Sequence, residues 1–121
     1  MSDGQLEIQI IEAVFERDVK TFGTMNPQYK ITWKDTVLEG HAAEGGGKNP
    51  KWSHIRSLDV GHDYSNAGVI TVVFTDDNDL IVQCELNVVD LCNAGNWRDW
   101  VNCYFEGQLQ GKCEVKTVYH G

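Results

Sequence analysis

The densest set of potential metal ligands in the chain is a run of three carboxylates, Asp76, Asp77 and Asp79, that directly follows an apolar segment. Carboxylate oxygens are ligands that Ca²⁺ prefers, and several at one loop could contribute to a calcium site. The same residue types are typical of a tight turn that closes a hairpin, because Asp and Asn tolerate turn conformations and hydrogen-bond to the nearby backbone. We favour the turn as the interpretation of this segment.

The chain has one local basic cluster, which we call the basic patch: Lys48, Lys51, His54 and Arg56. Alternate side chains of an extended segment lie on one face, so members of this set would share a surface if the segment is a strand. Such a surface is suited to a phosphoinositide headgroup or to an acidic partner.

Cysteine and histidine offer little catalytic chemistry here. The four cysteines lie far apart, and none forms a C-x-x-C pair of the kind used by zinc and redox centres: Cys84, Cys92, Cys103 and Cys113. No histidine stands in a local signature with any of them. Cys84 and Cys113 are expected on inward faces, where a thiol behaves as a small hydrophobe. The eighteen Asp and Glu residues single out no acid pair for glycoside hydrolysis. We predict no enzyme activity and no catalytic residue.

Composition predicts one compact domain over residues 1–121, because 121 residues with 41% hydrophobic content can bury a single ordinary core. The formal net charge of −8 would repel nucleic-acid phosphates, so nucleic acid is not an expected partner. The longest apolar stretches have only the length of a strand, so the sequence predicts no membrane-spanning helix. With unpaired cysteines, we expect a reducing, cytoplasmic location, peripheral to a membrane or to the cytoskeleton.

The elements that would position these residues are short strands. Apolar and polar residues alternate, as in strands with one wet face, near the beginning and the end of the chain. Residues 69–74 are almost continuously apolar, which predicts a central strand covered on both faces. The expected strands cover residues 6–10, 29–33, 36–43, 52–60, 69–74, 80–89, 100–105 and 113–117. Only residues 89–96 are compatible with a helical turn. The fold class predicted is therefore all-β, an eight-stranded antiparallel β-sandwich with little helix.

Several separated segments resemble one family. Residues 46–52, Gly-Gly-Lys-Asn-Pro-Lys-Trp, are similar to an Asn-Pro-x-Trp signature that precedes a core strand, and residues 22–31 are similar to a loop that leads into the second strand. Residues 73–79 resemble an acidic loop that follows a central strand, and residues 100–112 resemble a late Trp followed by Gly-Lys. In order and spacing, these segments resemble C2 domains, β-sandwiches whose loops at one end often bind Ca²⁺ and then phospholipid.

The resemblance implies a calcium site of about five carboxylates, and this chain has fewer. Lys20 stands at one first-loop position, or Asp18 if that loop is longer, and Thr75 stands at the first acidic position of the third loop. The candidate ligands are Asp18, Asn26, Asp76, Asp77 and Asp79. With so few charges, Ca²⁺ binding is expected to be weak, at about 10⁻⁴ to 10⁻³ M or weaker. No other cofactor is expected.

Apolar residues near these loops could insert into a lipid headgroup layer, or could equally belong to the core: Phe22, Met25, Leu80 and Ile81. The resemblance implies that Trp100 anchors the core, which leaves Trp97 as the exposed candidate for binding a partner. Arg56 stands where the resemblance implies an aromatic core residue. Either its side chain extends from the interior to the surface, or the register of the strand differs.

Two functions follow as hypotheses. The first is a non-enzymatic docking module, mainly independent of calcium, that binds a protein partner or a membrane-associated assembly. The alternative is calcium-dependent binding to phospholipid through the two acidic loops. A rise in stability with millimolar Ca²⁺ would favour the alternative.

Overall fold

The computed structural model describes residues 3–121 and contains eight strands and one short helix in that range. In chain order they are β1 (Gln5–Phe15), β2 (Gln28–Trp33), β3 (Thr36–Glu39), β4 (Ile55–Asp59), β5 (Val69–Asp76), β6 (Asp79–Asn87), α1 (Val88–Ala94), β7 (Asn96–Phe105) and β8 (Gln108–His120). Every pair of neighbouring strands is antiparallel. The predicted all-β, eight-stranded antiparallel sandwich is confirmed.

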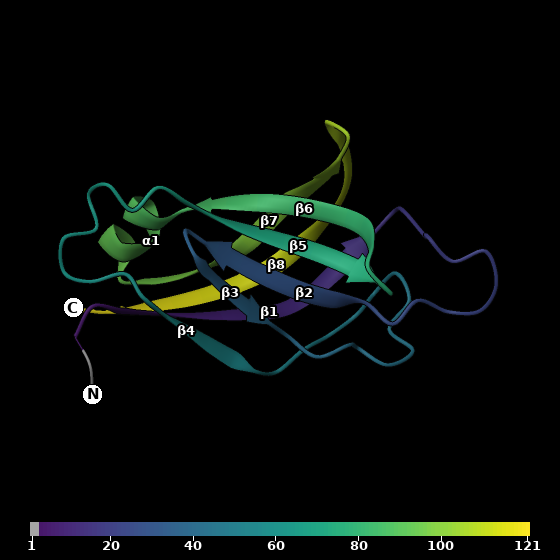
Figure 1. Cartoon of the computed structure of the whole chain (residues 1–121), viewed down its shortest axis with the longest axis horizontal. Coiled ribbons are helices and arrows are strands. Elements are labelled where there is room, and N and C mark those ends of the chain that lie inside the picture. The colour runs from purple at the N-terminus through teal and green to yellow at the C-terminus, as the bar shows by residue number, and fades with distance from the viewer. Residues whose placement is uncertain (1–2) are drawn as a thin grey trace.

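The strands are arranged in the order β3-β2-β5-β6-β7-β8-β1-β4. The link between β6 and β7 consists of a single residue pair, Gln83 with Tyr104, so the sheet divides there into two halves of four strands. Figure 1 shows β2, β5 and β6 in front of β1, β7 and β8. The two halves face each other as the layers of a sandwich, and the core lies between them.

The alternation of β1 explains how its side chains reach this core. Leu6, Ile8 and Ile10 are each 0% exposed. A bulge between Ile10 and Glu12 then shifts the phase by one residue, so that Ala13 and Phe15 point inward in turn. An extra residue in one strand of a pair has this effect, because successive side chains alternate between faces.

The expectation that β5 is covered on both faces is wrong. Its burial alternates, with Ile70, Val72 and Phe74 fully buried and Val69 45% exposed. β5 is central within its sheet, between β2 and β6. Each sheet of a sandwich has only one face against the core, and the outer face of β5 is shielded only in part by neighbouring strands.

The other expected elements are present with altered limits. β3 and β4 are shorter than residues 36–43 and 52–60, and β7 begins four residues earlier than position 100. The helical turn expected over residues 89–96 is α1, which begins after Asn87, whose side chain accepts a hydrogen bond from the Asp90 backbone N–H. Within residues 3–121, no helix has the length and apolar character needed to cross a membrane.

Candidate functional site

Three connections are hydrogen-bonded to one another at the end of the sandwich away from α1 (Figure 1): residues 16–27, residues 40–54 and the β5–β6 turn. The Gly45 backbone N–H donates to Asn26 Oδ1 at 2.7 Å, and the Gly47 N–H donates to the Met25 carbonyl at 3.0 Å. The Asn26 N–H donates to Asp76 Oδ1 at 2.8 Å. We call this unit the loop end.

Asp76 is the buried charge of the loop end. It is the last residue of β5, and only 2% of its surface is exposed. Its Oδ1 accepts from the Asn26 N–H, and its Oδ2 lies 3.4 Å from Lys20 Nζ. A buried carboxylate is stable only where hydrogen bonds and an opposite charge replace water. Both oxygens of Asp76 have such partners.

Lys20 joins the two acidic residues of the turn. Its Nζ also lies 3.1 Å from Asp77 Oδ2, and its side chain is 26% exposed. The hydrogen bonds to Asp77 and then to Asp76, with their charges, raise the pKa of Lys20 above its ordinary value. The ammonium group is therefore charged at any physiological pH. The Lys20 backbone N–H in turn donates to Asp18 Oδ1 at 2.9 Å.

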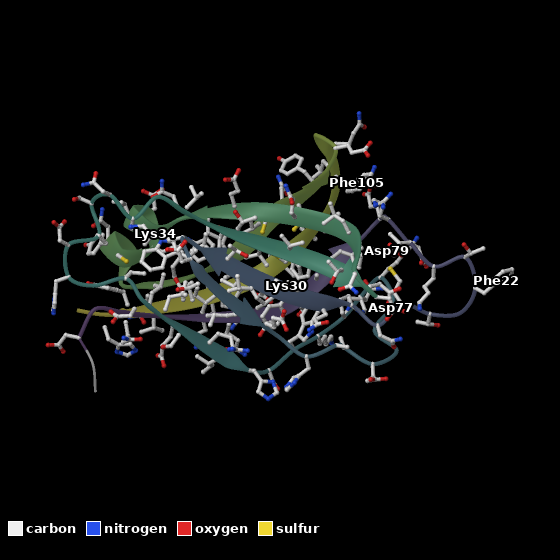
Figure 2. The ribbon with its side chains drawn as sticks, in the orientation of Figure 1. Phe22, Lys30, Lys34, Asp77, Asp79 and Phe105 are labelled. Atoms are coloured by element: carbon white, nitrogen blue, oxygen red, sulfur yellow. The ribbon has the colours of Figure 1, made fainter. Side chains whose placement is uncertain are left out.

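The acidic run closes a hairpin, as the turn interpretation predicted. Asp77 and Asn78 have φ angles of 48° and 71°, and Asp76 pairs with Asp79 across the turn. Two consecutive residues with positive φ are typical of the two-residue hairpin turn that matches the twist of its strands. Figure 2 shows Asp77 and Asp79 at this end of the sheet.

The five candidate calcium ligands lie in this region, and four of them are already paired with protein groups. Asp18 and Asn26 accept backbone hydrogen bonds, Asp76 and Asp77 pair with Lys20, and Asp79 is exposed at the first position of β6. In the described part of the chain, the one group of three or more Cys, His, Asp or Glu side chains close enough to share an ion consists of cysteines. Ca²⁺ takes six to eight oxygens, so these side chains fit it poorly while Lys20 is in place.

Comparison with known proteins identifies the fold. No protein-family model matches the sequence, and no curated protein matches it. Solved structures do match it. A C2 domain-containing protein superposes with a TM-score of 0.80 at 17% identity, over 96% of this chain and 88% of that one. The chain has the C2 fold.

Two further C2 structures agree. A C2 domain of plant extended synaptotagmin 1 has a TM-score of 0.80 at 18% identity, over 97% of this chain and 94% of that one. The calcium-bound pair of C2 domains of extended synaptotagmin 2 gives 0.81 at 16% identity, over 98% of this chain and 46% of that longer one. The predicted resemblance to C2 domains is thus confirmed at the level of the fold.

In this C2 fold, the four apolar residues predicted near the loops divide into two groups. Phe22 is 88% exposed at the tip of the β1–β2 connection (Figure 2). Met25 and Ile81 are each 0% exposed and belong to the core, and Leu80 is half-buried. Of the two alternatives left open for these residues, membrane insertion and the core, Met25 and Ile81 take the core, because both point inward where the loop end closes over the sandwich.

Sequence reasoning missed Arg17. Its Nε donates to the Ile81 carbonyl at 3.0 Å and its Nη2 to the Leu80 carbonyl at 3.1 Å. The guanidinium also lies 3.5 Å from the ring centre of Phe105. Arg17 thus connects the end of β1 to the start of β6 and to the β7–β8 hairpin. Its partners are more than sixty positions away, so no local spacing could have indicated it.

The basic patch lies along the β3–β4 connection and β4. Lys48, Lys51 and His54 are exposed, and the His54 ring lies edge-on to that of His41 with nitrogens 2.9 Å apart. Arg56 is half-buried on the same face of β4 as buried Leu58, and its guanidinium donates to the Glu39 carbonyl. Of the two alternatives for Arg56, the side chain that extends from an inward-facing position is the one observed.

The aromatic residues of β7 are reversed relative to the prediction. Trp97 is half-buried and packs against the core, whereas Trp100 is 39% exposed and lies beneath Lys112 Nζ at 4.7 Å. The expectation of an exposed Trp97 and a buried Trp100 is therefore wrong. Tyr104 and Leu109 pair across β7 and β8 and are 43% and 53% exposed. We call Trp100, Tyr104 and Leu109 the aromatic strip.

Proposed function

We propose that this chain is a non-enzymatic C2-type docking module that works without calcium and binds a protein partner, within a membrane-associated assembly in the cytoplasm. The observation that carries the proposal is the position of Lys20 Nζ, 3.4 Å from Asp76 and 3.1 Å from Asp77. A positive charge that belongs to the protein neutralises the acidic residues of the loop end. The fold can therefore keep its loops together with no metal ion.

Competition between Lys20 and Ca²⁺ favours the lysine. Calcium affinity in oxygen sites depends on how many charged ligands are available. An incoming ion would have to displace the ammonium from two carboxylates and would also meet its repulsion. The ammonium belongs to the same chain, two residues after Asp18. Once displaced, it therefore stays near the carboxylates at a high effective concentration and continues to compete with the ion. The remaining neutral ligand, Asn26, already accepts the Gly45 N–H.

The aromatic strip supports a protein as the partner. Trp and Tyr are enriched among residues that dominate protein–protein binding energy, because they bury a large area at little cost in side-chain entropy. Trp100 and Tyr104 expose 39% and 43% of their surface on β7, next to Leu109 on β8. The adjacent Lys112 supplies a charge for the rim of such an interface.

A calcium titration tests the proposal. We expect the unfolding temperature of the protein to be the same in millimolar Ca²⁺ as in a chelator, and Lys20→Gln to gain a rise with Ca²⁺ that Mg²⁺ does not give. Lys30→Gln is the matched control, because Lys30 pairs with Glu39 at 3.6 Å on β2 and β3 (Figure 2), away from the loop end. A calcium-specific rise in the unaltered protein would contradict the proposal.

The partner surface needs a separate test. Proximity labelling in chelator-treated cells should give a defined set of neighbours that the double variant Trp100→Ala, Leu109→Ser loses. Val37→Ser with Ile55→Ser is the control, because these residues are 54% and 60% exposed and lie on β3 and β4. Equal loss in both double variants would assign the effect to general surface hydrophobicity and not to the aromatic strip.

One observation favours a second candidate function, contact with a phospholipid surface. Phe22 is 88% exposed at the tip of the loop end, and an exposed aromatic tip can enter a headgroup layer. Flotation with phosphatidylcholine and phosphatidylserine vesicles, with Ca²⁺ or with a chelator, tests this candidate. Binding that Phe22→Ser abolishes in both conditions would support it, and binding only with Ca²⁺ would restore the calcium-dependent alternative.

A further inference from the structure

Three of the four cysteines meet inside the sandwich. Cys84 comes from β6, Cys103 from β7 and Cys113 from β8, and their exposed fractions are 4%, 0% and 0%. Their three Sγ atoms all lie within 4.8 Å of one another, and Cys84 Sγ and Cys113 Sγ are 3.8 Å apart. All four cysteines are unbridged. We call this set the three-thiol cluster.

The size of the cluster suits one metal ion. The three sulfur atoms are no more than 4.8 Å apart. An ion placed at the centre of such a triangle lies at most about 2.8 Å from each sulfur, which is 4.8 Å divided by √3. A metal–thiolate bond is about 2.3 Å long. Each sulfur would therefore move by about 0.5 Å or less. A rotation about χ1 of a cysteine supplies such a movement without a change in the backbone.

The ligand set indicates which ion. Thiolate sulfur is soft and selects Cu(I), zinc and iron–sulfur clusters. Structural zinc is almost always bound by four protein ligands, and within residues 3–121 this group has three members and no histidine or carboxylate. Cu(I) accepts three sulfurs in a plane. We propose that the three-thiol cluster binds one Cu(I) ion.

Proton release accompanies this binding, because the thiolate and not the thiol is the ligand. Thiol protons leave for solvent as the copper–sulfur bonds form. The oxidation state of the copper does not change.

An entry route lies beside the cluster. β6 and β7 are joined by a single residue pair, and a cleft of about 410 Å³ opens next to it. Cys84 lines this cleft together with Glu85 and Tyr104. The Glu85 carboxylate would attract a cation to the mouth, and the weak seam between the two strands allows the thiols to be reached. Once inside, the ion would be shielded from water.

The test is a competition for Cu(I) against a chromophoric chelator, under anaerobic reducing conditions. We expect the protein to take one Cu(I) per chain. Cys84→Ala, Cys103→Ala and Cys113→Ala should each weaken binding by about 100-fold or more, since loss of even an outer partner of a ligand costs 10- to 100-fold. Cys92→Ala is the matched control, because Cys92 is equally buried, in α1, but outside the cluster.

X-ray absorption on the copper-loaded, unaltered protein gives a second measurement that does not depend on whether the variants fold. Three sulfur neighbours are expected. The proposal is overturned if the reduced protein takes no Cu(I), if nitrogen or oxygen dominates the copper environment, or if Cys92→Ala loses as much affinity as the cluster variants. A protein that only forms a Cys84–Cys113 disulfide in air, with no copper uptake when reduced, also overturns it.

Discussion

Replacement of Asp76 by Asn should destabilise the fold far more than the same replacement at Asp77. Both changes remove one negative charge with almost no change in shape, and both weaken a contact with Lys20. The difference is burial, because the side chain of Asp76 is 3% exposed and that of Asp77 is 83% exposed. Asn also tolerates the positive φ of 48° at position 77.

The magnitude follows from the hydrogen bonds of Asp76. A hydrogen bond to a charged group contributes about 1.5–3 kcal/mol, against about 1 kcal/mol for a neutral one. Asn at position 76 can still accept the Asn26 N–H at Oδ1, but its amide nitrogen would face Lys20 Nζ, where Oδ2 now lies at 3.4 Å. We expect a loss of about 1.5–3 kcal/mol for Asp76→Asn, and a change within about 0.5 kcal/mol for Asp77→Asn.

Thermal unfolding measures this difference. The entropy of unfolding is about 2.1 cal/mol/K per residue, or about 0.25 kcal/mol/K for 121 residues. The unfolding temperature of Asp76→Asn should therefore fall by about 6–12 °C, and that of Asp77→Asn by about 2 °C or less. Equal losses in the two variants would refute the argument, because they would mean that the buried carboxylate contributes no more than an exposed one.

Three further predictions concern other contacts. Arg17→Gln should lower the free energy of unfolding, measured by chemical denaturation, by about 1.5–3 kcal/mol, because the two carbonyls that Arg17 bonds lose their donor. An unchanged free energy would mean that water replaces the guanidinium. The Tyr29 hydroxyl is buried without a partner among the described residues, and burial raises its pKa. Above about pH 10, Tyr29 ionises in the unfolded chain before it ionises in the folded one, so the free energy of unfolding should fall as the pH rises. Tyr29→Phe should reduce that fall and leave stability at about pH 7 unchanged. Trp97→Ala should cost about 1–3 kcal/mol, and more than Trp100→Ala, because Trp97 packs against the core and Trp100 is exposed. The reverse order would restore the original expectation for the two residues.

The strands were predictable because each half-buried strand carries its own signature. Leu6, Ile8 and Ile10 alternate with polar residues, and that local pattern needs no knowledge of the rest of the chain. The hairpin turn was predictable for the same reason, since Asp77 and Asn78 are among the few residues that tolerate two successive positive φ angles.

The exposure of Trp97 and Trp100 was predicted wrongly because the sequence allowed either residue to face the core. Trp97 and Trp100 are three positions apart, so in one strand they must point to opposite faces. The inward positions of Val101 and Cys103 decide in favour of Trp97, but only if β7 begins at Asn96. The expected strand began at position 100, which separated Trp97 from the residues that define its face.

The candidate site was less predictable, because its contacts join segments that are distant in the sequence. Lys20 and Asp77 are 57 positions apart, and no rule of spacing connects them. The residue identities alone indicated that Lys20 stands at a first-loop position of the expected calcium site. They could not indicate that this lysine would form ion pairs with two carboxylates of the opposite loop.

On the proposed function, this arrangement changes what can regulate docking. A calcium site gives a module two charge states, and the ion concentration selects between them. Lys20 is covalently part of the chain and stays charged at physiological pH, so the loop end has one charge state whatever the calcium level. Regulation must then act elsewhere, through the supply of the partner or through modification of its surface. A variant that lacks the Lys20 charge should place docking partly under calcium control, because the same two carboxylates would be released to an ion from solution.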